Sequence, residues 1–143
     1  MSTLLQPGLT YSHTFVVSES KLVPALYPEA PELQIMPNVF ATGFLVGLLE
    51  WTCIKAINPH IDWPSQQSVG TSIEIKHLAA TPAGFEITSS IELREVDGRR
   101  LVFSVEAHDG VDLICQGTHE RFIIDREKFD ARLKAKQSDR PAT

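Results

Sequence analysis

One long apolar segment constrains the fold of this chain more than any other feature. The stretch "VFATGFLVGLLEWTCIKAINPH", residues 39–60, predicts a helix that begins near Thr42, with Thr42 as its N-cap, and ends before Pro59. A helix without a polar stripe is normally surrounded by protein. This helix nevertheless contains Glu50. An unpaired carboxylate in such surroundings is costly, so Glu50 should have a partner or a raised pKa.

The residues after this helix alternate between apolar and polar with a period of two, which is typical of half-buried strands. The run "GTSIEIKHLAA", which starts at Gly70, places His77 on the apolar face. Two later runs and two Asp-Gly turn signals, at 97–98 and 109–110, extend the pattern to four strands in an antiparallel meander. Residues 9–18, rich in β-branched and aromatic types, predict one more strand. The expected sheet therefore has about five strands.

Two further segments complete the predicted architecture. Residues 20–40 contain four prolines, which preclude a long helix and predict short helical turns in an apolar, lid-like loop. The run "DREKFDARLKAKQ" predicts a terminal helix with Asp125 as N-cap, followed by a frayed tail at about 138–143. A single α+β domain over residues 1–143 is expected, with the hotdog architecture of a long central helix wrapped by an antiparallel sheet. Because one such unit leaves its helix and sheet edges uncovered, we expect a homodimer.

Composition and charge narrow the class of protein. A chain of 143 residues can bury a core without disulfides or metal. The net charge of −5 argues against a nucleic-acid binder. The N-terminal residues lack a signal-peptide pattern, and no apolar run is long enough for a membrane span. Cys53 and Cys115 are expected to be small, buried, apolar residues of a cytoplasmic protein, and the scattered histidines indicate no metal site.

Three polar side chains are predicted to face the same apolar layer: Thr42, Glu50 and His77. Eight residues separate Thr42 from Glu50, which is about 12 Å along a helix axis and about 80° around it. They cannot touch within one helix, so a histidine or a substrate lies between them, or a second subunit supplies one of them. The functional hypothesis is an acyl-transfer or hydrolytic site. His77 would be the general base, Glu50 would orient it or activate water, and Thr42 would be nucleophile or hydrogen-bond donor.

A purely structural interpretation is available for each of these residues. Thr42 alone is explained as a helix cap and His77 as a satisfied core histidine, whereas a buried glutamate is harder to explain without function. Other acids and imidazoles are weaker candidates, because "HDG" predicts a turn and "THER" predicts a strand with solvated charges. These weaker candidates are His108, Asp109, Asp112, His119 and Glu120, with Lys128, Lys134 and Lys136 interpreted as a solvated basic face.

Five motifs together resemble the fluoroacetyl-CoA thioesterases and their hotdog-fold relatives: "VFATGFLVGLLEW", "GTSIEIKHLAATPAG", "VDGRRL", "AHDGVD" and "GTHER". The resemblance covers nearly the whole chain. It implies that Thr42, Glu50 and His77 are catalytic. It further implies a set of substrate contacts: Gly70 to the acyl-CoA through its backbone, Arg121 toward the coenzyme A portion, and Val23, Met36 and Phe40 in the lid region around the acyl group.

The function implied is hydrolysis of a small acyl-CoA to the free acid and coenzyme A, with coenzyme A as part of the substrate and no separate cofactor. One residue departs from the fluoroacetyl-specific enzyme, because Met36 stands where that enzyme has an aromatic residue just before the lid proline. A flexible thioether fills space differently from a ring, so the acyl group stays open. The alternatives are an acyl-CoA-binding or sensing domain without activity, and a hydratase of the same fold.

Overall fold

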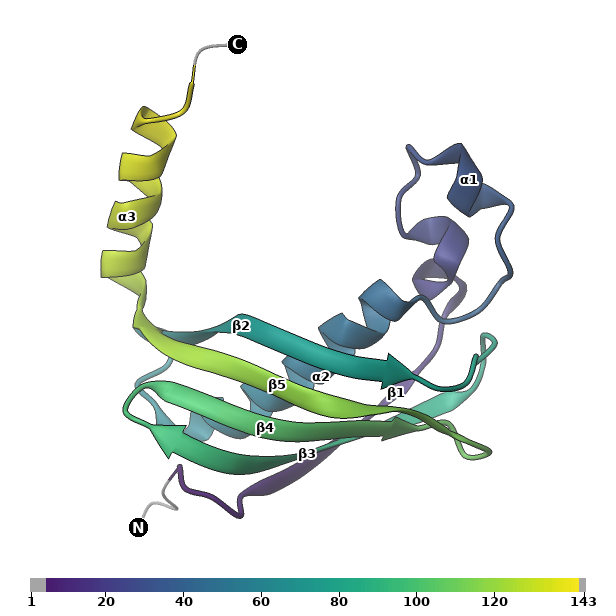
Figure 1. The fold of residues 1–143 in the computed structure, drawn as a ribbon, viewed down its shortest axis with the longest axis horizontal. Helices are drawn as coiled ribbons and strands as arrows, with labels where there is room; N and C mark the ends of the chain where they lie inside the picture. Colours follow the sequence, from purple (N-terminus) through teal and green to yellow (C-terminus); the bar gives the residue numbers. More distant parts are fainter. Residues whose placement is uncertain (1–4, 142–143) are drawn as a thin grey trace.

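The computed structural model describes residues 5–141, in which a five-stranded sheet curves around one long helix (Figure 1). The elements, in chain order, are β1 (Thr10–Val16), η1 (Glu19–Lys21), η2 (Val23–Ala25), α1 (Pro31–Gln34), α2 (Thr42–Ile57), η3 (Asn58–His60), β2 (Gln66–His77), β3 (Glu86–Asp97), β4 (Arg100–His108), β5 (Leu113–Asp125) and α3 (Arg126–Ser138). The predicted α+β architecture, with a central helix, about five strands and a C-terminal helix, is confirmed.

The strand order in the sheet is β1-β3-β4-β5-β2, and every neighbouring pair is antiparallel. The predicted meander is correct for β3, β4 and β5 but wrong for β2, which pairs with β5 and not with β3. β2 and β3 are joined by residues 78–85, a connection that is longer than a tight hairpin turn. The carbonyl of Thr81 in this connection accepts a hydrogen bond from the Phe40 N–H at 2.8 Å. This connection therefore packs beside the start of α2, and β2 becomes an edge strand.

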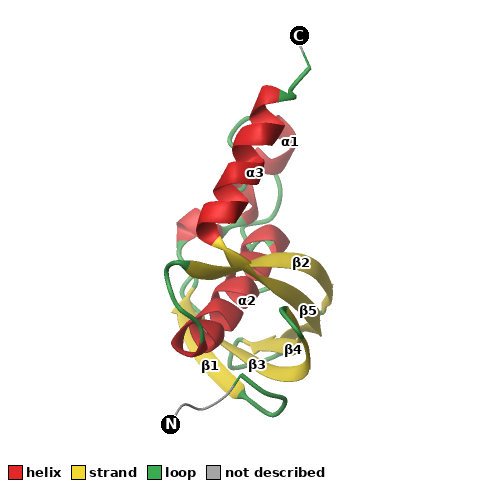
Figure 2. Cartoon of the chain, turned by 90° about the vertical axis from the view of Figure 1, so that its left-hand side faces the viewer, coloured by secondary structure: helices red, strands yellow, loops and turns green. Residues whose placement is uncertain are grey.

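α2 lies across the concave face of the sheet, with one side buried and the other open (Figures 1 and 2). Gly43, Gly47 and Trp51 are exposed on the open side, so the expectation that a single chain leaves its helix partly uncovered is confirmed. Cys53 and Cys115 are buried free thiols, as predicted. The buried side packs on inward-facing residues of the strands, and consists of Leu45, Leu48, Leu49, Thr52, Cys53, Ala56 and Ile57.

The segment that precedes α2, residues 18–40, is called the lid segment below. As its four prolines predict, it contains only short helices. Its base is fixed by a bridge between Leu22 and Phe40, and the Ala41 N–H donates to the carbonyl of Lys21 at 3.1 Å. The remainder extends past the start of α2 (Figure 1). The lid is thus anchored where the helix begins.

A buried hydrogen bond joins the connection at residues 78–85 to the turn between β4 and β5. The Thr81 hydroxyl donates to Asp109 Oδ2 at 2.8 Å, while Asp109 Oδ1 accepts the N–H groups of Val111 and Asp112. Burial raises the pKa of Asp109, but these donors outweigh it, so the pKa lies below its usual value. The predicted Asp-Gly turn is confirmed, since Gly110 has a φ of +91°.

Both helix caps differ in detail from the expectation. Ala41, and not Thr42, is the N-cap of α2, so that prediction is wrong; Thr42 is the first helical residue, and its hydroxyl bonds elsewhere. Asp125 is the N-cap of α3, as predicted, but its carboxylate contacts Arg99 and Lys128 and not the helix N–H groups.

α3 buries no residue and projects from the end of β5 (Figure 2). Part of the predicted frayed tail, residues 142–143, lies outside the described residues. None of the helices described here has the length and apolar content that a membrane span requires.

Candidate active site

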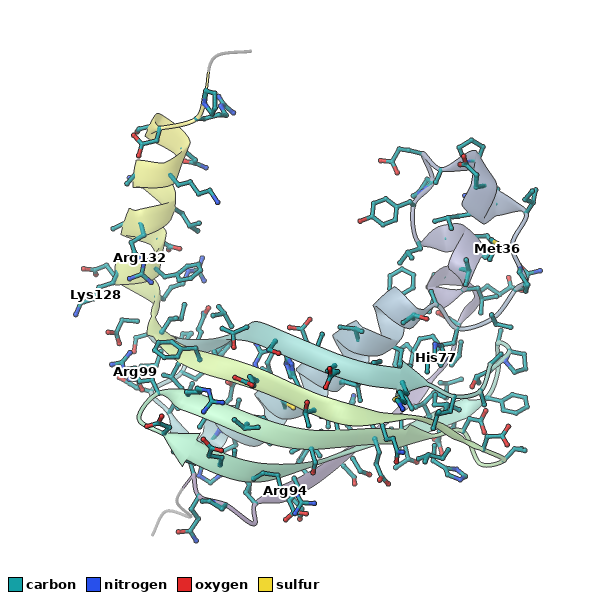
Figure 3. The ribbon with its side chains drawn as sticks, in the orientation of Figure 1. Met36, His77, Arg94, Arg99, Lys128 and Arg132 are labelled. Carbon is teal, nitrogen blue, oxygen red and sulfur yellow. The ribbon has the colours of Figure 1, made fainter. Side chains whose placement is uncertain are left out.

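The first polar group of the site lies at the start of α2. Thr42 Oγ1 and His77 Nδ1 are 2.7 Å apart, which is a hydrogen bond between the first residue of α2 and the last residue of β2. His77 shares the inward face of β2 with Ile73 and Ile75, as the alternation predicts. Figure 3 shows His77 at the end of β2, below the lid segment that carries Met36. Thr42 and His77 are called the start pair below.

The electrostatics of the start pair favour a neutral imidazole. Burial lowers the pKa of His77, against a smaller opposing effect of the Ala79 backbone. Its Nε2 is buried and has no hydrogen-bond partner among residues 5–141. With its proton on Nε2, the neutral ring accepts the Thr42 hydroxyl at Nδ1. His77 is therefore poised to take a proton from that hydroxyl or from a water molecule.

The backbone around Thr42 adds a second chemical element. The first intrahelical bond of α2 runs from the Leu45 N–H to the Ala41 carbonyl at 2.9 Å. The N–H groups of the first helical turn precede this bond and lack intrahelical acceptors. Such N–H groups, with the positive end of the helix dipole, can stabilise an oxyanion. The space beside Gly43 is narrow, because a Cβ there would lie 3.1 Å from Leu26 Cδ1 of the lid segment.

The second polar group contains Glu50, the one carboxylate of the apolar helix α2. Glu50 Oε1 accepts a hydrogen bond from Arg121 Nη1 at 3.0 Å. The Arg121 side chain is 3% exposed and the Glu50 side chain 38% exposed, so the pair extends from the core to the surface. Arg121 also donates from Nε to the Ser68 hydroxyl at 2.8 Å and from Nη2 to the Ser68 carbonyl at 2.7 Å. Glu50 is therefore tolerated because a buried cation holds it.

The interpretation of "THER" as a strand with solvated charges is wrong for two of its residues. His119 and Arg121 are buried, and only Glu120 between them turns outward, where it pairs with Arg100 at 3.0 Å. The signal that could have shown this is the period of two, since His119 and Arg121 share a face with Cys115. His119 is a residue of this group that the sequence argument undervalued, and Ser68 is one that it missed.

The structure assembles the predicted residues in two places and not in one. Thr42 and His77 are together, and Glu50, Arg121 and Gly70 are together. A Cβ on Gly70 would lie 2.6 Å from Glu50 Oε1. Within one chain Glu50 pairs with Arg121 and not with His77, and about 12 Å of helix separates it from Thr42. The group of Glu50, Arg121, His119 and Ser68 is called the mid-helix group below.

The three predicted acyl contacts lie in different surroundings. Val23 is half-buried in η2, and Met36 on the lid segment is 47% exposed. Phe40 is 1% exposed and stacks on Phe15, with ring centroids 6.2 Å apart, so the role that the structure shows for this ring is core packing. No cluster of three or more metal-binding side chains occurs in the described part of the chain.

A helix wrapped by a five-stranded antiparallel sheet is the hotdog architecture, and the hydroxyl–imidazole pair at the helix start has the groups of a hydrolytic site, as in the thioesterases of this fold. Similarity to known proteins agrees. Residues 18–127 match the family described as fluoroacetyl-CoA-specific thioesterase. A fluoroacetyl-CoA thioesterase of Streptantibioticus cattleyicolor is 51% identical over 132 residues, which cover 92% of this chain and 94% of that protein. The chain belongs to this family and is a thioester hydrolase.

Solved structures show the same relationship. The structure of the fluoroacetyl-CoA thioesterase FlK superposes with a TM-score of 0.90 at 51% identity, covering 92% of this chain and 97% of that one. A Thermus thermophilus protein described as a thioesterase superfamily member superposes with a TM-score of 0.82 at 26% identity, covering 95% and 98% of the two chains. The predicted hotdog fold is thereby confirmed.

Proposed function

We propose that this protein hydrolyses a short acyl-CoA, with fluoroacetyl-CoA as the first candidate, to the free acid and coenzyme A. The observation that carries the proposal is the 2.7 Å contact between Thr42 Oγ1 and His77 Nδ1 at the N-terminus of α2. The names of the relatives support the substrate class. A threonine-to-alanine variant of FlK has been solved with fluoroacetate, and a threonine-to-serine variant with acetyl-CoA.

The proposed chemistry begins with neutral His77, which takes a proton from the Thr42 hydroxyl or from water. The oxygen so activated attacks the thioester carbonyl carbon, and the first-turn N–H groups of α2 stabilise the oxyanion. The C–S bond then breaks, and the departing thiolate takes the proton from His77. If Thr42 is the nucleophile, water then attacks the acyl carbon, the bond from that carbon to Thr42 Oγ1 breaks, and a proton of the water passes to Thr42 Oγ1 as the acid is released. Glu50, held by Arg121, activates that water, and coenzyme A enters only as part of the substrate.

Met36 bears on the choice of acyl group. Its half-exposed, unbranched side chain lies on the lid segment, where a rigid ring in the fluoroacetyl-specific enzyme would fill space differently. We propose that this chain discriminates less between fluoroacetyl-CoA and acetyl-CoA than an enzyme with a ring at this position. Gly70 and Val23 are proposed substrate contacts. Arg121 is proposed to act toward coenzyme A only through the carboxylate it holds, because each of its nitrogens already donates within the chain.

We further propose a homodimer that acts in the cytoplasm. In the described part of the chain β2 pairs with β5 alone, so its outer edge is open, and one side of α2 is exposed. Two copies paired antiparallel through β2 about a two-fold axis would cover both features. Such pairing would set the His77 end of one β2 toward the end of the other that carries Gly70. Each active site would then combine a start pair from one chain with a mid-helix group from its partner.

The test is a panel of short acyl-CoAs, including fluoroacetyl-CoA, acetyl-CoA and a 2-enoyl-CoA, with the pure protein and detection of free thiol. Thiol release at catalytic rates is expected. Tight binding without thiol release would overturn hydrolysis in favour of a sensor. Loss of the enoyl absorbance with the thioester intact would identify a hydratase. Light scattering of the same sample measures the mass of the assembly and so tests the dimer.

A further inference from the structure

His119 is a buried imidazole for which the proposed chemistry has no direct use. It lies on β5, its residue is 2% exposed, and both of its ring nitrogens have partners. Nδ1 is 2.8 Å from the carbonyl oxygen of Ser72, and Nε2 is 3.1 Å from Arg121 Nη1. The Ser72 carbonyl follows an irregularity in β2, between Gly70 and Ser72, where the register with β5 shifts. Such irregularities often redirect groups beside active sites.

The two partners determine the tautomer of His119. A carbonyl oxygen only accepts, so Nδ1 carries the proton. A guanidinium nitrogen only donates, so Nε2 is the acceptor. The ring is therefore neutral, with N–H at Nδ1 and a lone pair toward Arg121. A second proton, on Nε2, would face the Arg121 N–H directly.

The surroundings keep His119 neutral. Burial lowers its pKa and Arg121 lowers it further, while the Ser72 carbonyl, Glu50 and Glu120 act in the opposite direction. These neighbours of the ring lie on β2, α2 and β5. Cys53 of α2 also lies near Arg121 and Glu50, but it is a neutral thiol because burial raises its pKa to about 12. His119 thus stays neutral, and accepts from Arg121, to a lower pH than a free imidazole would.

Arg121 connects this imidazole to Glu50. Its Nη1 donates both to Glu50 Oε1 and to His119 Nε2, and its other two nitrogens donate to Ser68. The Ser68 contacts fix one end of the planar guanidinium, and His119 fixes the end that holds the carboxylate. Without the His119 acceptor, the rigid guanidinium could tilt as a whole on its Ser68 contacts, and Nη1 would shift relative to Glu50.

We propose that His119 is a positioning residue for hydrolysis, because its Nε2 fixes the Arg121 guanidinium that aims the Glu50 carboxylate beside Gly70. The proposal rests on the proposed function, in which Glu50 activates water. It assigns Arg121 and His119 to one buried support for a single carboxylate. Displacing a catalytic group by as little as 1 Å can cost about 10²-fold in rate, so a support of this kind has a measurable effect.

Two amide substitutions separate the two contacts of His119. His119→Asn places an N–H near the position of Nδ1 and keeps the bond to Ser72, but removes the acceptor for Arg121. His119→Gln places its side-chain oxygen near the position of Nε2 and keeps that acceptor. His108→Asn is the matched control, since His108 is an exposed imidazole whose Nδ1 accepts the Gly110 N–H. Glu50→Gln and the double variant E50Q/H119N complete a double-mutant cycle.

The expected result is a fall in kcat in H119N of about tenfold to 10²-fold, with KM changed by less than about twofold. H119Q should recover most of that loss, and H108N should match wild type. In the cycle, E50Q/H119N should be no slower than E50Q alone, because His119 acts through Glu50. A merely structural role would predict further loss in the double variant.

The contrary outcomes are distinct. Activity retained in E50Q would overturn the proposed role of Glu50 and the inference with it. Activity lost in E50Q but retained in H119N would overturn the inference alone. A rise in KM at constant kcat would assign His119 and Arg121 to substrate binding. If H119N does not fold, the ¹⁵N resonances of the wild-type imidazole decide: a protonated Nε2 at neutral pH would overturn the proposal, and a bare Nε2 with a protonated Nδ1 supports it.

Discussion

The start pair and the mid-helix group each have one member on α2 but are built on opposite principles. The start pair has one hydrogen bond between its members and a buried ring nitrogen with no partner in the described chain. In the mid-helix group every nitrogen of Arg121 and of His119 is engaged. A base must keep unused capacity to take a proton, whereas a carboxylate that aims water needs a fixed support. The difference thus separates a base that keeps a ring nitrogen without a partner from a carboxylate that its neighbours hold in place.

The largest expected effect comes from removing one reactive group from each region. His77→Ala and Glu50→Gln should each lower the rate of thiol release from a short acyl-CoA by at least about 10²-fold. Parallel assays with the matched control His108→Asn show whether the loss is specific. Near-wild-type rates in both variants would refute the assignment of both groups. Loss in H77A alone would make the mid-helix group structural.

Mixing these two variants tests whether the two regions cooperate across a dimer. If each site combines His77 of one chain with Glu50 of the other, a heterodimer of H77A and E50Q contains one intact site. Equal amounts, unfolded together and refolded, should then regain about a quarter of wild-type activity, because half of the dimers are mixed and each has one of two sites. We expect this recovery. No recovery in a sample shown to contain heterodimers would place both groups of each site in one chain.

The pH dependence reports on an imidazole in each region, because the pKa values of His77 and His119 are both lowered by burial. The pKa of His77 is lowered from 6.5, so kcat should hold from neutral pH to below 6.5 and fall only at lower pH, as the ring becomes protonated. His77 and His119 stay neutral in the folded chain in a range where the unfolded chain binds protons. The free energy of unfolding should therefore fall as the pH drops from 6.5 toward the lowered pKa values. Rate profiles and urea unfolding measure the two effects.

If the fall of kcat at low pH persists in the residual activity of E50Q, the titrating group is His77. If that fall disappears in E50Q, it does not come from His77, and the assignment of the base would be wrong. Unfolding free energies that do not change below pH 6.5 would contradict the neutral, buried state of the two imidazoles.

The smallest expected effect is on stability and concerns the connection at residues 78–85, which packs beside the start of α2. Thr81→Val removes the hydroxyl that donates to Asp109 and leaves a buried carboxylate oxygen without this donor. The cost should be about 1–3 kcal/mol in the free energy of unfolding, measured in urea. Arg94→Ala is the control, since Arg94 pairs with Glu92 at the surface, and should change stability by no more than about 0.5 kcal/mol. Equal effects of the two substitutions would show that the Thr81 contact carries no special weight.

Local patterns in the sequence predicted most of the elements, and the failures have a common cause. The period of two placed His77 correctly, and the prolines predicted a lid segment of short turns. The partner of β2 was wrong because strand pairing depends on where a connection packs, which no local pattern records. The partner of Glu50 was missed for a similar reason: Arg121 lies 71 residues away, and only the register of β2 against β5 brings it near.

The absent side chain of Gly70 ties the backbone of β2 to the chemistry of α2. A methyl group here would overlap the Glu50 carboxylate, which is the far end of a flexible side chain and would ordinarily move aside. Arg121 holds that carboxylate, so a movement that relieves the overlap would strain the ion pair. An added methyl group at this position would therefore act on a charge interaction as well as on space.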